Sequence, residues 1–190
     1  MQSTLEPEKR FVEQVRKSVI GARKRGFNVG VSIILGLPGE TDADISAITN
    51  LCGAVRARFR GMITATVTPF VPKAGTPFQW AAMAPLHVLR TRQRRLQRDL
   101  RKYKINAHLE SPEWAIVQGV LARGDERVGQ ALAACQAPAR GAWHDALYVY
   151  DVDPDRYLGG WSLDAPLLWD EMGPGPDQDL LRREYQRAII

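Results

Sequence analysis

The segment Ile33–Thr41 contains the residue types from which a ligand-binding turn is built. It reads Ile-Ile-Leu-Gly-Leu-Pro-Gly-Glu-Thr and closes a mostly apolar, β-branched run, Val29–Leu35, that is typical of a buried parallel strand. Glycines at the end of such a strand let a ligand approach the backbone. The helix expected next presents unpaired N–H groups and the positive end of its dipole. An ordinary strand-to-helix turn, with Glu40 and Asp42 favourable near the helix start, explains the same residues. Neither the phosphate loop with Gly-Lys-Ser/Thr nor the dinucleotide pattern Gly-x-Gly-x-x-Gly is present.

The cysteines and histidines do not predict a metal site on this chain. Cys52 and Cys135 stand 83 positions apart, outside any Cys-x-x-Cys pair, and the three histidines are scattered without ligand spacing. Two reduced thiols in a cytosolic protein are the simpler interpretation. His108 and His144 are candidate acids or bases, although single histidines without partners are more often structural.

The turn needs strands and helices to hold it, and the hydrophobic pattern predicts them. Apolar residues recur at helical spacing over Glu8–Arg25 and again over Asp42–Arg58. Met62–Thr68 alternates apolar residues with threonines, which predicts a strand with one apolar face and one hydroxyl face. The order helix, strand, helix, strand predicts a parallel sheet. Two strands cannot make a stable parallel sheet, so we expect the chain to begin partway through a larger α/β domain.

The rest of the chain divides by composition. We expect residues 1–82 to belong to the α/β part, residues 83–104 to form a basic helix, and residues 105–190 to form a mainly helical extension. Within the extension, Ile105–Leu109 is a candidate short strand. Ser111 is a candidate N-cap for a helix that starts at Pro112.

Charge is distributed unevenly along the 190 residues, whose net charge is +5. Residues 83–104 carry eight basic and one acidic residue, whereas residues 105–190 carry seven basic and fourteen acidic ones. The basic helix either contacts RNA or pairs with the acidic extension. The composition is that of a soluble globular protein, with 45% hydrophobic and 25% charged residues. We find no secretory signal or membrane-length apolar run, and expect a cytoplasmic location without a membrane partner.

Three parts of the chain resemble radical SAM (S-adenosylmethionine) enzymes of the methylthiotransferase and elongator type. Ile33–Thr41 looks like the turn found late in their catalytic barrel. The exit Thr68–Trp80, which reads Thr-Pro-Phe-Val-Pro-Lys-Ala-Gly-Thr-Pro-Phe-Gln-Trp, is similar to the end of the next barrel strand. Three later segments resemble the C-terminal extension of an uncharacterised subgroup, some of whose members carry a cobalamin-binding domain: Glu110–Trp114, Gln118–Asp125 and Pro166–Asp170. The resemblance covers about residues 8–188.

What the resemblance implies is the C-terminal portion of a radical SAM Fe–S enzyme. Residues 1–82 would be late β/α units of a partial (β/α)6 TIM-like barrel that binds S-adenosylmethionine and a [4Fe–4S] cluster. Reductive cleavage of S-adenosylmethionine in such enzymes yields a 5′-deoxyadenosyl radical. Cobalamin would be a further cofactor of some longer relatives, bound outside this chain.

The resemblance also implies site residues, which are carried over by motif. The adenine side of the S-adenosylmethionine pocket would be shaped by Ile34, Gly36, Pro38 and Gly39. The turn itself would be fixed by Glu40 and Thr41. The end of the next strand would be lined by Thr68, Pro69 and Phe70. Near substrate, at the open face of the barrel, we place Lys73 and Thr76 by position alone.

The departures from the family are as informative as the matches. The cluster loop Cys-x-x-x-Cys-x-x-Cys is absent, because the chain has two cysteines, and the glycine-rich motif that grips the methionyl amine is absent too. Both belong to early strands, which we expect on a missing N-terminal barrel half of the same or a separate polypeptide. The chain alone is therefore not expected to cleave S-adenosylmethionine. The alternative is a non-catalytic binding module, either a half-barrel that pairs with a partner or an RNA-binding protein.

Overall fold

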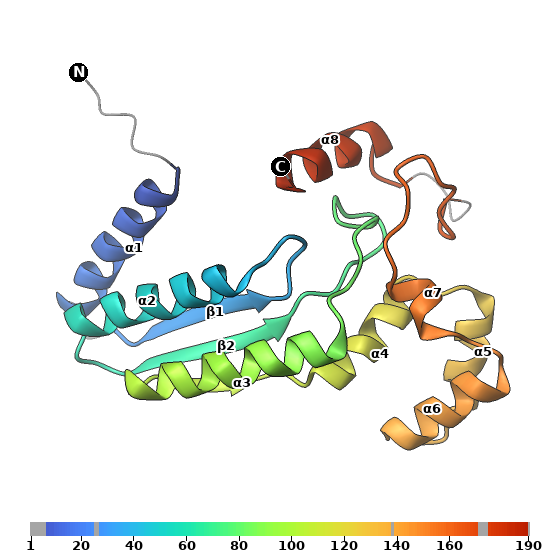
Figure 1. Ribbon diagram of the computed structural model, residues 1–190, viewed down its shortest axis with the longest axis horizontal. Helices are drawn as coiled ribbons and strands as arrows, with labels where there is room; N and C mark the ends of the chain where they lie inside the picture. The colour runs from blue at the N-terminus through green and yellow to red at the C-terminus, as the bar shows by residue number, and fades with distance from the viewer. Residues whose placement is uncertain (1–6, 25–26, 138, 171–174, 190) are drawn as a thin grey trace. The chain divides into compact units, whose positions relative to one another are not determined.

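The computed structural model of the chain describes residues 7–24, 27–137, 139–170 and 175–189 (Figure 1). Its contacts divide the chain into two compact units. The sheet unit comprises Met1–Leu35, Glu40–Thr68 and Arg90–Glu110. The helical unit comprises Gly36–Gly39, Pro69–Leu89 and Ser111–Ile190. Each unit has its own hydrophobic core.

The first six elements alternate helix and strand. Their bounds are α1 Pro7–Lys24, β1 Val29–Leu35, α2 Asp42–Arg58, β2 Ile63–Pro69, α3 Leu86–Lys102 and β3 Asn106–Leu109. The strands form one sheet in the order β1-β2-β3, and β2 pairs with β3 in parallel. The arrows of β1 and β2 also point the same way in Figure 1. The expected α/β class with a parallel sheet is confirmed, and the barrel stays a prediction.

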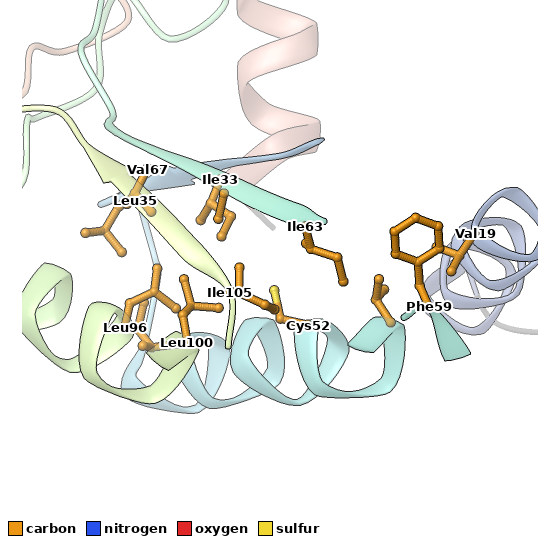
Figure 2. Close-up of a cluster of buried hydrophobic side chains, with 13 residues drawn as sticks. Val19, Ile33, Leu35, Cys52, Phe59, Ile63, Val67, Leu96, Leu100 and Ile105 are labelled. Atoms are coloured by element: carbon orange, nitrogen blue, oxygen red, sulfur yellow. The ribbon is translucent and has the colours of Figure 1, made fainter. Parts of the chain in front are cut away.

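One face of the sheet is packed and the other is open. Ile33, Leu35, Ala65 and Val67 are buried and share a core with Leu96 and Leu100 of α3, as Figure 2 shows. The intervening positions point the other way. Along β1 they are exposed, and in β2 and β3 they are exposed or partly exposed: Gly30, Ser32, Ile34, Thr64, Thr66, Thr68, Asn106 and His108. Parallel sheets are usually apolar and covered on both faces, so a polar open face sets this sheet apart.

The helical unit confirms the mainly helical character expected for the extension. Its helices are α4 Pro112–Ala122, α5 Glu126–Ala134, α6 Arg140–Val149, α7 Pro154–Leu158 and α8 Gln178–Ile189. Ser111 caps α4 as expected, because its hydroxyl accepts the backbone N–H of Trp114 at 3.3 Å and Pro112 follows in the first helical turn. The core beneath these helices includes Trp143, Tyr157 and Leu158.

Residues 106–109 belong to the sheet and not to the helical extension in which their acidic surroundings predict them. Thr64 pairs with Asn106, and Thr66 pairs with His108. The helix α3 is shared, because Leu96 and Leu100 belong to the sheet core and Leu89 to the helical core. The basic helix therefore serves as the crossover between β2 and β3, which charge alone does not reveal.

Candidate functional site

The turn after β1 holds two glycines in the left-handed region, for different reasons. Gly36 has φ of +89°, and a Cβ there would stand 2.5 Å from Cδ2 of Leu89. Gly39 has φ of +78°, and a Cβ there would meet nothing within 4 Å. Packing within the helical unit thus explains Gly36 without a ligand. Gly39 leaves its backbone open to approach, as a ligand-binding turn requires.

The carboxylate of Glu40 is held by the basic helix and does not face solvent. Nη1 of Arg92 donates to Oε1 of Glu40 at 2.8 Å, and Nη2 donates to the Glu40 backbone carbonyl at 2.8 Å. The Glu40 side chain is 5% exposed and that of Arg92 16% exposed. One guanidinium therefore fixes both the side chain and the backbone of Glu40, the residue before the N-cap of α2. This geometry supports the expected role of Glu40 in fixing the turn.

Thr41 begins α2 with a reciprocal cap. The Thr41 N–H and hydroxyl each donate to Oδ2 of Asp44 at 2.7 Å, and the Asp44 N–H donates back to the Thr41 hydroxyl at 3.4 Å. The Thr41 hydroxyl and backbone N–H hold the pKa of the Asp44 carboxyl below its usual value. Asp42, in the same turn, lies 3.7 Å from both Arg92 and Arg95. The helix start is thus ordered by its own residues and by α3.

Two predicted residues lie near the carboxyl ends of β1 and β2 in the sheet unit. Ile34 is 53% exposed, an unusual exposure for an isoleucine one position before the end of a strand. Thr68 is partly buried and precedes the last residue of β2. Ligands of parallel α/β sheets bind at the carboxyl ends of strands, so Ile34 is placed as an apolar ligand contact would be.

The remaining predicted residues belong to the helical unit, where two of them are buried by packing. Pro69 is buried, and Phe70 is 9% exposed with its ring edge-on to Phe78 at 5.4 Å between centroids. Lys73 is exposed, and its backbone carbonyl accepts the hydroxyl of Thr76 at 2.8 Å. Lys73 thus presents an exposed side chain, whereas the Thr76 hydroxyl donates to a partner. Pro38 is half-buried.

Sequence reasoning missed two buried polar side chains that organise the helical unit. Gln79 is 0% exposed and its Oε1 accepts the backbone N–H of Gly75 at 3.0 Å and Nε1 of Trp169 at 2.9 Å. Its Nε2 donates to Oε1 of Gln178 at 2.7 Å. Contacts that join residues 90 or more positions apart leave no periodic signal in the sequence.

Arg123 is the second of these residues. It is 1% exposed, its Nη1 and Nη2 donate to the carbonyls of Ala81 and Gly159 at 2.9 Å, and its guanidinium lies 4.1 Å from the ring centroid of Trp161. Burial lowers the pKa of Arg123 to about 10, so the side chain stays charged at neutral pH. A new helix begins shortly after it, because Asp125 caps α5 and pairs with Arg127 at 3.3 Å.

The two thiols do not fit an iron–sulfur cluster. Cys52 is 2% exposed within the sheet core, and burial raises the pKa of its thiol, which disfavours the thiolate that a cluster binds. Cys135 ends α5, and its thiol donates to the carbonyl of Ala137 at 3.3 Å. In the described ranges, no three His, Cys, Asp or Glu side chains converge as a metal site requires.

Comparison with known proteins gives a relative without a described activity. The chain is similar to an uncharacterized protein of Methanocaldococcus jannaschii, with 30% identity over 118 residues that make up 62% of this chain and 26% of the relative. The chain therefore spans about a quarter of the length of this curated relative. No family model matches the sequence, and no solved structure matches it. Among the described helices, none is both long enough and apolar enough to cross a membrane.

Proposed function

We propose that this chain is the C-terminal portion of a radical SAM Fe–S enzyme and contributes part of the S-adenosylmethionine pocket. The observation that carries the proposal is the parallel sheet with one polar, open face. A barrel arc covers its outer face with helices and turns its inner face toward the lumen, whereas a doubly wound sheet is covered on both faces. Here α2 and α3 supply a common core on one face only. The alternation of threonines along β2 places hydroxyls on the other.

The residues of the strand ends fit the adenosine part of the cofactor better than its sulfonium centre. Ile34 offers an exposed apolar contact, and Gly39 is exposed with open space where a side chain would stand. Arg92 and Asp44 hold the adjacent residues Glu40 and Thr41 in place. When bound, S-adenosylmethionine would supply a 5′-deoxyadenosyl radical. The residues of this chain would bind and orient the nucleoside, and the two cysteines give no place for the cluster.

An N-terminal barrel half would dock against the edge of β1. β1 is an edge strand, and an apolar groove of about 610 Å³ runs along it between α1 and α2. Its partly exposed apolar walls are formed by Val15 of α1, by β1 itself and by Ile48 of α2. An added strand would pair with the open β1 edge and bury these side chains. The relative, about four times longer than the matched segment, has ample chain for such strands.

The experiment pairs this chain with the polypeptide that carries the cluster loop, either fused before residue 1 or co-expressed. After anaerobic reconstitution with iron and sulfide, S-adenosylmethionine is added with dithionite as the electron donor, and we expect 5′-deoxyadenosine only when both halves are present. The chain alone, treated identically, is the matched control and should show no [4Fe–4S] absorption. A full-occupancy cluster on this chain alone contradicts the proposal, and so does a cluster-loaded pair that leaves S-adenosylmethionine intact.

A second candidate function is a non-catalytic binding module that pairs with a partner polypeptide. The same groove favours it, because the groove can take a strand from any partner. The partner strand would then come from a polypeptide without a cluster loop. The two candidates are separated by the docked sequence, since a partner that contains Cys-x-x-x-Cys-x-x-Cys supports the enzyme and any other strand supports the module.

A further inference from the structure

Acidic residues are almost absent from two stretches of the sheet unit. Residues 45–68 and 90–109 together contain eleven basic residues and a single acidic one, Asp99. Eight of the basic residues lie on α3 or directly after it. Asp99 is shared, because Arg98 lies 3.2 Å and Lys102 2.8 Å from the same carboxylate oxygen. The local charge therefore remains strongly positive after this pairing.

The basic residues of α3 divide between two sides of the helix. Arg92 and Arg95 reach α2, where they meet Glu40, Asp42 and the hydroxyl of Ser46. Exposed residues instead follow helical spacing on the solvent side: Arg90, Arg94, Arg98 and Arg101. At 1.5 Å per residue this row extends about 16 Å, opposite the buried positions Gln93, Leu96 and Leu100.

The row continues onto the loops at the end of α3, and Arg56 holds these loops together. Its Nε and Nη2 donate to the carbonyls of Tyr103 and Lys104 at 3.0 and 3.1 Å. Its Nη1 donates to the carbonyls of Phe59 and Gly61 at 3.2 and 2.9 Å. Arg60 stands between the last two residues and is exposed, as is Lys104. The Arg56 guanidinium thus joins the loop before β2 to the loop before β3. The first loop presents Arg60 to solvent, and the second presents Lys104.

We propose that this surface binds the phosphate backbone of a nucleic acid. The basic surface is defined by Arg58, Arg60, Arg94, Arg98, Arg101, Lys102 and Lys104. A regular row of guanidinium groups suits phosphates, which it neutralises without reading bases. It lies along α3 and at the end of the sheet where β2 and β3 begin, whereas the proposed cofactor residues lie where β1 and β2 end. The inference therefore stands apart from the proposed function.

The test measures binding of the 190-residue chain to a short fluorescent RNA duplex and to a DNA duplex of the same sequence, by anisotropy at several salt concentrations. We expect binding to weaken linearly in log–log form with salt. The triple variant Arg94→Gln, Arg98→Gln, Arg101→Gln should lower the magnitude of the slope by about 2 to 3, since each phosphate contact contributes about 0.7 to 0.9. The tighter duplex identifies the nucleic acid.

A charge-matched control separates this surface from net charge. The variant Arg140→Gln, Arg183→Gln, Arg187→Gln removes three exposed arginines of the helical unit and should keep the wild-type slope. Circular dichroism checks that both variants fold. If the salt dependence of binding decreases equally in the two variants, the proposal is overturned. So does displacement of the duplex by polyglutamate, which would point to an acidic protein segment, or the absence of salt-dependent binding.

Discussion

At the turn after β1, neighbouring residues that look alike in the sequence have different tasks. Gly36 is required because Leu89 occupies the place of a side chain, whereas Gly39 faces open space. Glu40 is held by Arg92, and Thr41 and Asp44 cap α2. The residues with the best geometry for a ligand are therefore Ile34 and Gly39. The others build the turn that presents them.

The Asp44 cap predicts acid sensitivity at the start of α2. Thr41 holds the pKa of Asp44 below its usual value in the folded chain, so the carboxylate stabilises the fold above its unfolded pKa. That stability is lost as the pH falls through the lower, folded pKa. We expect the urea midpoint of the wild type to decrease as the pH is lowered from 5 to 3. The Asp44→Asn variant should have a lower urea midpoint at pH 5, and that midpoint should change less over the same pH range. An identical pH dependence in Asp44→Asn would contradict the cap.

At the scale of elements, α3 is a structural crossover as well as a basic helix. Its buried side packs Leu96 and Leu100 on the sheet, and Arg92 ties it to the residue before the N-cap of α2. The described ion pairs of Arg92 and Arg95 go to Glu40 and Asp42, within the sheet unit and not to the acidic extension. Part of the positive charge of α3 is thus neutralised by acidic residues of the same unit.

Removing the Arg92 guanidinium is expected to destabilise the sheet unit. Arg92→Met leaves the Glu40 carboxylate and carbonyl without these hydrogen bonds, and the loss should be about 2 kcal/mol, typical of a hydrogen bond to a charged group. Arg94→Met, on the exposed side of the same helix, should change the free energy of unfolding by less than about 0.5 kcal/mol. Urea denaturation measures both, and equal losses would show that the pair does not hold the turn.

The periodic elements could be predicted from the sequence, and the long-range polar contacts could not. The strand Val29–Leu35 and the helix Asp42–Arg58 match the structure because hydrophobic spacing and turn residues specify them locally. The pairing of β3 with β2, the Arg56 clamp and the Gln79 contacts depend on residues far apart in the chain. Within the candidate site, the turn after β1 could be predicted from its glycines. The burial of Phe70 against Phe78 depends on tertiary packing.

At the scale of the whole molecule, β1 is an open edge of the sheet formed by the described residues. The groove between α1 and α2 exposes apolar side chains beside unpaired backbone groups of an edge strand. A docked strand would satisfy the backbone groups and cover the apolar ones together. Both candidate functions share this docking, which makes it testable without knowledge of the substrate.

A cation in the groove should block docking without unfolding the chain. Ser18 lines the groove and is exposed, so Ser18→Arg should weaken co-purification of the cluster-bearing half at least tenfold. Asn50→Arg adds the same charge at an exposed position of α2 outside the groove and should co-purify normally. If Ser18→Arg pairs as well as Asn50→Arg does, the groove is not the docking site.

The central claim is that the ends of β1 and β2 form part of an adenosine pocket, and amide NMR tests it most directly. The ¹⁵N-labelled chain is titrated with S-adenosylmethionine, with adenosine, and with guanosine as the mismatched nucleoside. We predict shifts concentrated at the amides of residues 34–41 and 68–70, apart from Pro38 and Pro69, which have no N–H. S-adenosylmethionine and adenosine should give the same shifts, and guanosine should give none. Unchanged spectra at millimolar S-adenosylmethionine, or shifts confined to other residues, would contradict the account.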